Sequence, residues 1–269
     1  HPHNLVMELA SSYSVPVSDK NAVFVYAGIV GEPAIGPTAF MHRLSGSDNP
    51  EAPISHHWLD STHITNGVVT IGYTTPDWKF EGSTFHGREP DQYRYRMELG
   101  ALDSYSGRIT FNPNSDVSMQ ASAARIHSPE TLEPNVNLDR ITTSITFNKM
   151  IDGGLSQTTL AFGRNIPNRG IATNAYLIES SWVWSANNTV FLRAEKVDKN
   201  ELFYPEDALA ENNFNIKKVS LGAVHDFKST NDYTLGLGVV GSLYSFPNAL
   251  DNFYGNDPKS LMFFMRVKL

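Results

Sequence analysis

Residues 259–269 read KSLMFFMRVKL, and apolar side chains occupy every odd position from 261 onward. The members of this apolar set are Leu261, Phe263, Met265, Val267 and Leu269. Arg266 and Lys268 take even positions, while Met262 and Phe264 interrupt the polar set. Because successive side chains of a strand point to opposite sides, this period of two predicts a β-strand with an apolar face and a more polar face.

The same alternation recurs in roughly thirteen segments, each closed by turn-forming residues. Their centres lie near residues 10, 26, 70, 82, 107, 121, 145, 160, 179, 192, 221, 238 and 264. Helix signals are nearly absent, and the Glu-containing stretch 205–212 is expected to hold at most one helical turn within a loop. The sequence therefore predicts an all-β chain.

The connectors between these segments alternate in length. The short ones are rich in Gly, Pro, Asn, Asp and Ser, as tight hairpins require, and lie at 18–21, 75–77, 112–115, 152–154, 185–187 and 228–231. The long ones lie at 32–65, 87–100, 128–137, 200–213 and 247–259, with a short exception near 167–169. Outer-membrane barrels alternate short periplasmic turns with long extracellular loops in this way.

These patterns predict an antiparallel, up-and-down transmembrane β-barrel of about 12–16 strands. Residues 1–269 are expected to form one barrel domain, with the extracellular loop 32–65 folded into its mouth. Bacterial single-chain barrels have an even number of strands, so an odd count indicates either a miscounted strand or strands upstream of residue 1. Aromatic residues near the predicted strand ends fit the girdles found at both membrane interfaces, although strands of any kind favour aromatics.

Composition restricts the function. The net charge of -7 argues against a nucleic-acid partner, which a basic stripe would bind. Absence of cysteine excludes disulfides and thiolate metal sites. Charged side chains are expected in outward loops (Arg43, Glu51, Arg88, Glu89, Asp91) and on the polar side of strands (Arg108, Glu179, Arg193, Glu195). Such charges form salt-bridge networks or the charged constriction of a pore, or in loops are simply solvated.

Histidine is concentrated in the predicted outward loops. Imidazole nitrogen is a common ligand for Zn and Cu, and a candidate metal set comprises His1, His3, His56, His57, Asp60 and His63. No fixed-spacing metal motif accompanies these residues. The preferred interpretation is structural, with the histidines at strand ends and hydrogen-bonded to loop backbone, and no cofactor is required.

Several motifs resemble a largely uncharacterised family of proteobacterial outer-membrane proteins: HPH at 1–3, AFMHR at 39–43, HHWLDSTHI at 56–64 and GREPDQ at 87–92. The last ten residues, 260–269, are also similar to the terminal strand that such barrels present to their assembly machinery, although Leu269 stands where Phe is usual. The resemblance implies a location in the outer membrane, with lipid and that machinery as partners. It also links the chain loosely to metal-resistance gene clusters, which names no substrate.

The predicted function is a porin-like channel for small hydrophilic solutes or ions. One alternative is a non-conducting binding or structural barrel with a His-rich, metal-binding mouth. A second alternative is a hydrolase at the rim, where Asp60, Ser61 and His63 lie close in sequence. No G-x-S-x-G elbow is present, so an enzyme is not expected.

Overall fold

The computed structural model describes residues 5–60, 65–91, 93, 95–131, 133–151, 154–185, 187–203, 206–210, 212–228 and 233–268. The chain divides into two compact units. Unit 1 comprises residues 1–39, 56–145 and 161–174, and unit 2 comprises residues 40–55, 146–160 and 175–269. The faces and the sites of each unit are described separately below.

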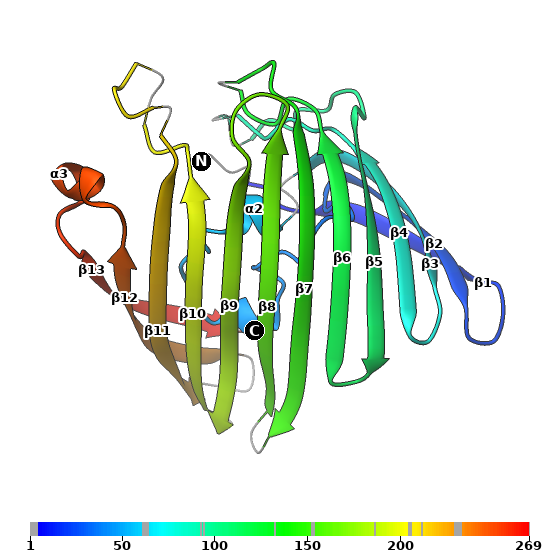
Figure 1. The fold of residues 1–269 in the computed structure, drawn as a ribbon. Helices are drawn as coiled ribbons and strands as arrows, with labels where there is room; N and C mark the ends of the chain where they lie inside the picture. Colours follow the sequence, from blue (N-terminus) through cyan, green and yellow to red (C-terminus); the bar gives the residue numbers. More distant parts are fainter. Residues whose placement is uncertain are drawn as a thin grey trace. The chain divides into compact units, whose positions relative to one another are not determined.

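Thirteen strands are found in the described residues, and each is hydrogen-bonded to the next in chain order from β1 to β13 (Figure 1). They are β1 (Leu9–Pro16), β2 (Ala22–Gly31), β3 (Thr65–Thr74), β4 (Trp78–Phe85), β5 (Ser104–Asn114), β6 (Val117–Ile126), β7 (Leu138–Ile151), β8 (Gly154–Pro167), β9 (Thr173–Ser185), β10 (Asn188–Lys199), β11 (Phe214–Lys228), β12 (Thr234–Ser245) and β13 (Lys259–Lys268). Every predicted centre falls inside its strand. The all-β, antiparallel, up-and-down prediction is confirmed.

The predicted alternation of connectors is also confirmed. Short connectors follow the odd-numbered strands, at 17–21, 75–77, 115–116, 152–153, 186–187 and 229–233. Long connectors follow most even-numbered strands, at 32–64, 86–103, 127–137, 200–213 and 246–258, and 168–172 is the short exception. Strand alternation and turn chemistry are local properties of the sequence, and for that reason they can be read from it directly.

The helices of the described residues are short and lie in the long connectors: α1 (Leu44–Ser47), α2 (His56–Leu59), η1 (Asn248–Leu250) and α3 (Asp251–Tyr254). None of these was predicted. The helical turn allowed for 205–212 is instead a hydrogen-bonded turn over 207–210, in which Ala210 N donates to Asp207 O at 3.1 Å. Among the described residues, no helix combines the length and the apolar character that crossing a membrane requires.

In unit 1, one face of strands β3 to β5 carries mainly polar side chains and the other face carries mainly large apolar side chains. We call these the polar face and the apolar face of the unit. Thr70 and Ser83 pair across β3 and β4 on the polar face, 3% and 6% exposed, and their hydroxyl oxygens are 2.6 Å apart. Ile71 and Phe80 lie on the apolar face and are exposed.

Residues 32–36 lie on this polar face. Ala34 N donates to Ser83 Oγ at 2.8 Å, and Gly36 N donates to Ser122 Oγ at 2.8 Å. A small apolar cluster forms beneath them, made of Ile35, Val68, Phe85, Ala124 and Ile126. Gly36 has φ +68, and a Cβ there would lie 1.6 Å from Leu59 O, so only glycine fits between this segment and α2.

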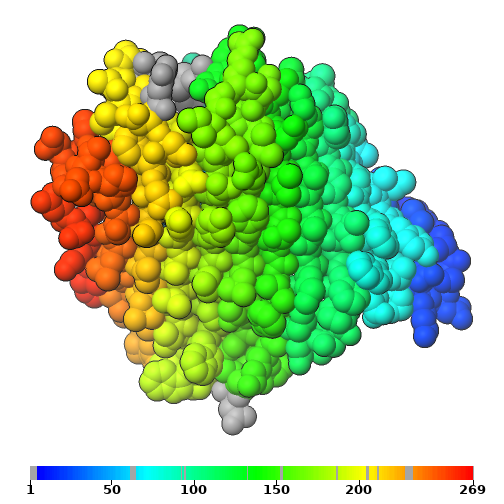
Figure 2. Space-filling model, viewed as in Figure 1, coloured from blue at the N-terminus to red at the C-terminus, as the bar shows by residue number. Residues whose placement is uncertain are grey.

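The strands of unit 2 also have a polar face and an apolar face, and the two faces differ more strongly in the exposure of their side chains. On β9, the odd-numbered residues from 175 to 181 are buried and the even-numbered residues are more exposed, so that Glu179 is 0% exposed while Trp182 is 61% exposed. The polar face of unit 2 carries Glu179, Ser181, Arg193, Glu195, Lys218, Ser220, Asp226 and Ser242. Its apolar face carries Tyr176, Ile178, Trp182, Trp184, Leu192, Val219, Leu221, Phe227, Leu237, Leu243 and Phe263. Figure 2 shows side chains covering the outer surface of β9 and β10 without a break.

Candidate functional site

The polar face of unit 2 is covered by residues 40–55, which we call the anchored loop. Five ionisable groups of the strands are buried on this face: Glu179, Arg193, Glu195, Lys218 and Asp226. Their positions follow from strand alternation, because each lies an even number of residues from the other buried positions of its own strand. Buried charges require partners, and the anchored loop provides many of them.

Glu179 is the centre of the network. One carboxylate oxygen accepts hydrogen bonds from Arg43 Nε and, at 3.0 Å, from Ser45 Oγ. The other accepts from Arg193 Nε at 3.0 Å. The carboxylate therefore lies between two guanidinium groups, one from the anchored loop and one from β10. A Cβ at Gly46 would come within 3.0 Å of this carboxylate, so a glycine allows the close approach.

Arg193 also binds the backbone of the anchored loop. Its Nη1 donates to Glu51 O at 2.5 Å, and its Nη2 donates to Gly46 O at 3.4 Å. The side chain of Glu51 accepts from Lys218 Nζ at 3.1 Å and from Ser242 Oγ at 3.0 Å. These contacts tie the middle of the anchored loop to β10, β11 and β12.

Two more carboxylates complete the attachment. Asp48 accepts hydrogen bonds from Ser181 Oγ and from Arg266 Nη1. Arg266 in turn holds Asp226 with two parallel hydrogen bonds of 3.0 and 2.8 Å. Glu195 accepts from both the backbone N and the Oγ of Ser55, at 3.0 and 2.7 Å. The network thus fixes the loop at several separate points.

Of the predicted charged residues, five lie together in this network: Arg43, Glu51, Glu179, Arg193 and Glu195. They are paired or hydrogen-bonded across the interface between the anchored loop and the strands, so they are not solvated loop charges. The network also includes Ser45, Asp48 and Ser55, which were not predicted from the sequence. A contact between residues more than a hundred positions apart cannot be recognised from the sequence around either residue.

In unit 1 the polar face keeps an open hollow of about 420 Å³ beside β1 to β4. Arg108 donates from Nε to Glu81 Oε2 at 2.7 Å and from Nη1 to Gly36 O at 3.0 Å. Lys79 Nζ lies 2.8 Å from Glu81 Oε1. Tyr26 OH donates to Glu8 Oε1 at 2.9 Å on another wall of the hollow. The hollow therefore presents both signs of charge.

Three further predicted residues belong to the connector after β4, also in unit 1. Arg88 Nη2 donates to Ser128 Oγ at 3.2 Å, and Glu89 N donates to Pro129 O at 3.0 Å. Asp91 Oδ1 accepts from Tyr93 N at 2.7 Å within its own connector. Arg88 and Glu89 thus link this connector to the one after β6.

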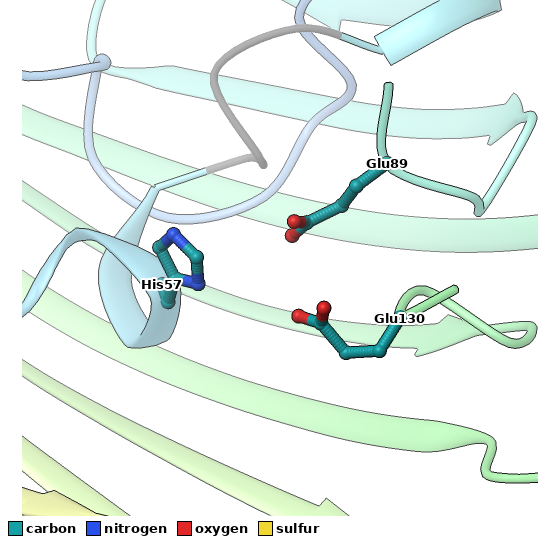
Figure 3. A group of neighbouring side chains, drawn as sticks. All are labelled: His57, Glu89 and Glu130. Carbon is teal, nitrogen blue, oxygen red and sulfur yellow. The ribbon is translucent and has the colours of Figure 1, made fainter. Parts of the chain in front are cut away.

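A cluster of metal-ligand types lies at this link (Figure 3). His57 of α2, Glu89 and Glu130 each direct a ligand atom to a common point, and these atoms lie within 4.8 Å of one another. His57 is 5% exposed, and the two glutamates are half-buried. Glu130 was not predicted, because nothing local distinguishes it from other loop carboxylates.

The remaining predicted metal ligands do not join this cluster in the described residues. The His56 ring contacts the His57 ring edge-on, with centroids 4.2 Å apart, and Asp60 is fully buried. His1, His3 and His63 lie outside the described residues, as does Ser61 of the hydrolase hypothesis.

No family model matches the sequence, and no curated protein matches it. Several solved structures match it weakly. The anion-selective porin from Comamonas acidovorans is 13% identical, with 88% of this chain and 79% of that chain covered at a TM-score of 0.48. OccAB3 from Acinetobacter baumannii is 9% identical, and the match covers 96% of this chain and 67% of that chain at a TM-score of 0.47. The loop L8 deletion mutant of OmpT, an outer membrane protein of Vibrio cholerae, is 8% identical, and the match covers 96% of this chain and 89% of that chain at a TM-score of 0.48. What this chain does has to follow from its own surfaces and side chains.

Proposed function

We propose that this chain is a β-barrel of the bacterial outer membrane and acts as a porin-like channel for small hydrophilic solutes or ions. The observation that carries the proposal is the inverted distribution of polarity in unit 2. Glu179 and Arg193 are 0% and 1% exposed, whereas Leu221 and Phe263 are 60% and 78% exposed. Water-soluble proteins bury apolar side chains and rarely expose apolar patches this continuous. Acyl chains are the solvent that favours such a surface.

The same reasoning extends to the edges of the sheet. Lipid cannot hydrogen-bond to the backbone N–H and C=O groups of an unpaired strand, so open sheet edges do not occur within the hydrocarbon region. The proposal therefore requires that the outer edge of β1 and the outer edge of β13 are each hydrogen-bonded to a partner in the membrane. Insertion by the barrel assembly machinery, through the terminal strand β13, belongs to the same proposal.

In this barrel the polar faces line an aqueous lumen. The anchored loop narrows the lumen against β9 to β13, because it is attached by ion pairs to Glu179, Lys218 and Arg266. The hollow in unit 1 provides space for water and small solutes beside Glu81 and Arg108. Charges of both signs suit small polar solutes and ions and exclude bulky apolar molecules. No step of bond making or breaking is involved, so the proposed activity is not enzymatic.

Planar-bilayer recording tests this function. The protein is folded in detergent, checked by the shift in gel mobility between unheated and boiled samples, and added to a bilayer in potassium chloride. We expect stable conductance steps that scale with salt concentration, and none from boiled protein. Well-folded protein that inserts without conducting would exclude the channel.

The second candidate is the non-conducting binding or structural barrel. It is favoured by the close fit of the anchored loop, since Arg193, Lys218 and Ser242 are all less than 5% exposed beneath it. Swelling of proteoliposomes in sugars of increasing size separates the two functions. A channel admits the small sugars and rejects the large ones, whereas a plugged barrel admits none.

A further inference from the structure

The cluster of His57, Glu89 and Glu130 has the composition of a cation site. Its three side chains come from three separate segments: α2, the connector after β4 and the connector after β6 (Figure 3). The ligand atoms lie within 4.8 Å of one another. Zn–N and Zn–O bonds are about 2.0–2.2 Å long, so side-chain shifts of roughly 1 Å would bring all three atoms onto a single ion. All three residues belong to unit 1.

The imidazole is held in place by its own segment. His57 O accepts a hydrogen bond from Asn165 Nδ2 at 3.1 Å. The next residue, Trp58, is 1% exposed, and its Nε1 donates to Thr173 Oγ1 at 2.8 Å. A Cβ at Gly163 would lie 2.2 Å from Trp58 O, so α2 rests directly on the backbone of β8. This packing fixes the position from which His57 projects.

The two carboxylates are brought together by contacts made elsewhere in their segments. Glu89 N donates to Pro129 O at 3.0 Å, next to Glu130 in the sequence. Arg88 Nη2 donates to Ser128 Oγ at 3.2 Å, and Ser128 has a left-handed backbone with φ 44. Gly87 N donates to Asp103 Oδ1 at 2.9 Å. These contacts place two carboxylates side by side, and a cation bound between them would be attracted to both.

We propose that His57, Glu89 and Glu130 bind one divalent transition-metal ion, and that Zn²⁺ is the ion best suited to them. One imidazole nitrogen and two carboxylate oxygens are ligands that Zn²⁺ accepts in tetrahedral sites, with water in the fourth position. Mg²⁺ and Ca²⁺ prefer oxygen alone, and Cu(I) prefers sulfur, which this set lacks. The charge of one dication matches the combined charge of the two carboxylates.

This ligand set differs from the one expected from sequence, since two carboxylates from other loops replace the neighbouring histidines. The proposal stands apart from conduction, because a plugged barrel would hold the ion equally well. Its structural consequence is a cross-link between three outward connectors, which stabilises the rim of unit 1.

Isothermal titration of detergent-folded protein with Zn²⁺ tests the site. Glu89→Gln and Glu130→Gln keep the shape of each side chain and remove a ligand charge, and each is expected to weaken one Zn²⁺ equivalent by about tenfold or more. The matched control is Glu133→Gln, which alters an exposed carboxylate of the same connector and leaves the affinity unchanged. Zn²⁺ is also expected to raise the unfolding temperature of the wild type and of the control, and to raise that of Glu89→Gln much less.

Other histidines can bind Zn²⁺ nonspecifically, so the comparison between variants is the decisive measurement. Equal Zn²⁺ affinity in the wild type, Glu89→Gln and Glu130→Gln overturns the proposal, whatever the total stoichiometry. An unfolding temperature of the wild type that is the same in Zn²⁺ and in chelator overturns it as well. In either case His57, Glu89 and Glu130 do not form a Zn²⁺ site. Folding of each variant is verified in chelator, where all should unfold at similar temperatures.

Discussion

Replacing Glu179 by glutamine removes the negative charge between two buried guanidinium groups. Arg43 is 4% exposed and Arg193 is 1% exposed, so neither cation can reach bulk water without displacing the anchored loop. Glutamine keeps the size of the side chain and one acceptor oxygen. The substitution therefore isolates the charge from the packing.

The structure allows an estimate of the cost. Removing one member of a buried ion pair destabilises a protein by about 3–5 kcal/mol, because the partner remains buried and uncompensated. At about 1.4 kcal/mol per tenfold, the unfolding equilibrium should change by more than about a hundredfold. Asp139→Asn is the matched control, because Asp139 pairs with Arg125 where both side chains are 44% exposed. An exposed pair contributes about 0–1 kcal/mol.

Urea unfolding of the detergent-folded protein, followed by tryptophan fluorescence, measures both costs. We expect the midpoint to fall strongly for Glu179→Gln and hardly at all for Asp139→Asn. A double-mutant cycle that adds Arg43→Gln measures the coupling between the two groups. If Glu179→Gln costs no more than Asp139→Asn, the charges beneath the anchored loop are hydrated, and the reasoning from burial is wrong.

Two further predictions concern the membrane and the loop. Leu221 lies at the middle of β11 on the apolar face, so Leu221→Lys should destabilise the membrane-inserted protein by about 2–4 kcal/mol. The control Leu99→Lys, in an exposed connector, should be nearly neutral. Equal unfolding midpoints of the two variants in lipid vesicles would contradict a lipid-facing β11. The double variant Asp48→Asn, Glu51→Gln removes the ion pairs of the anchored loop with Arg266 and Lys218. Its single-channel conductance should therefore be higher than that of the wild type or should fluctuate more. The control Asp116→Asn, in the turn after β5, should leave the recording unchanged.

The strands were predictable because their information is local. Period-two hydrophobicity and turn residues fixed all thirteen strand positions and the alternation of connector lengths. The short helices α1 and α2 were not predictable, since a helix of one turn has little stability of its own and depends on tertiary contacts. Trp58 illustrates this dependence, because its indole is held by Thr173 across more than a hundred residues.

In the candidate sites, the residues on strands were predictable and the residues in long connectors were not. Glu179, Arg193 and Glu195 could be assigned to a polar face from alternation alone. Their partners Ser45 and Ser55 could not, because the path of a long connector over a sheet is set by contacts distant in sequence. Glu130 in unit 1 could not be assigned to its cluster for the same reason, because it also lies in a long connector.

The burial of these charges bears directly on the choice between a channel and a plugged barrel. Each ion pair beneath the anchored loop exchanges hydration for a protein partner, so the free energy that holds the loop depends on how dry that interface is. If the interface is dry, the loop is immobile, and the conductance is steady or absent. If the interface is hydrated, Asp48 and Glu51 can exchange their protein partners for water at little cost in free energy, and the loop can then move when solutes pass. The stability measurement at Glu179 and the conductance of the Asp48, Glu51 variant therefore have to agree: a large cost at Glu179 requires a quiet wild-type recording that the loop variant disturbs.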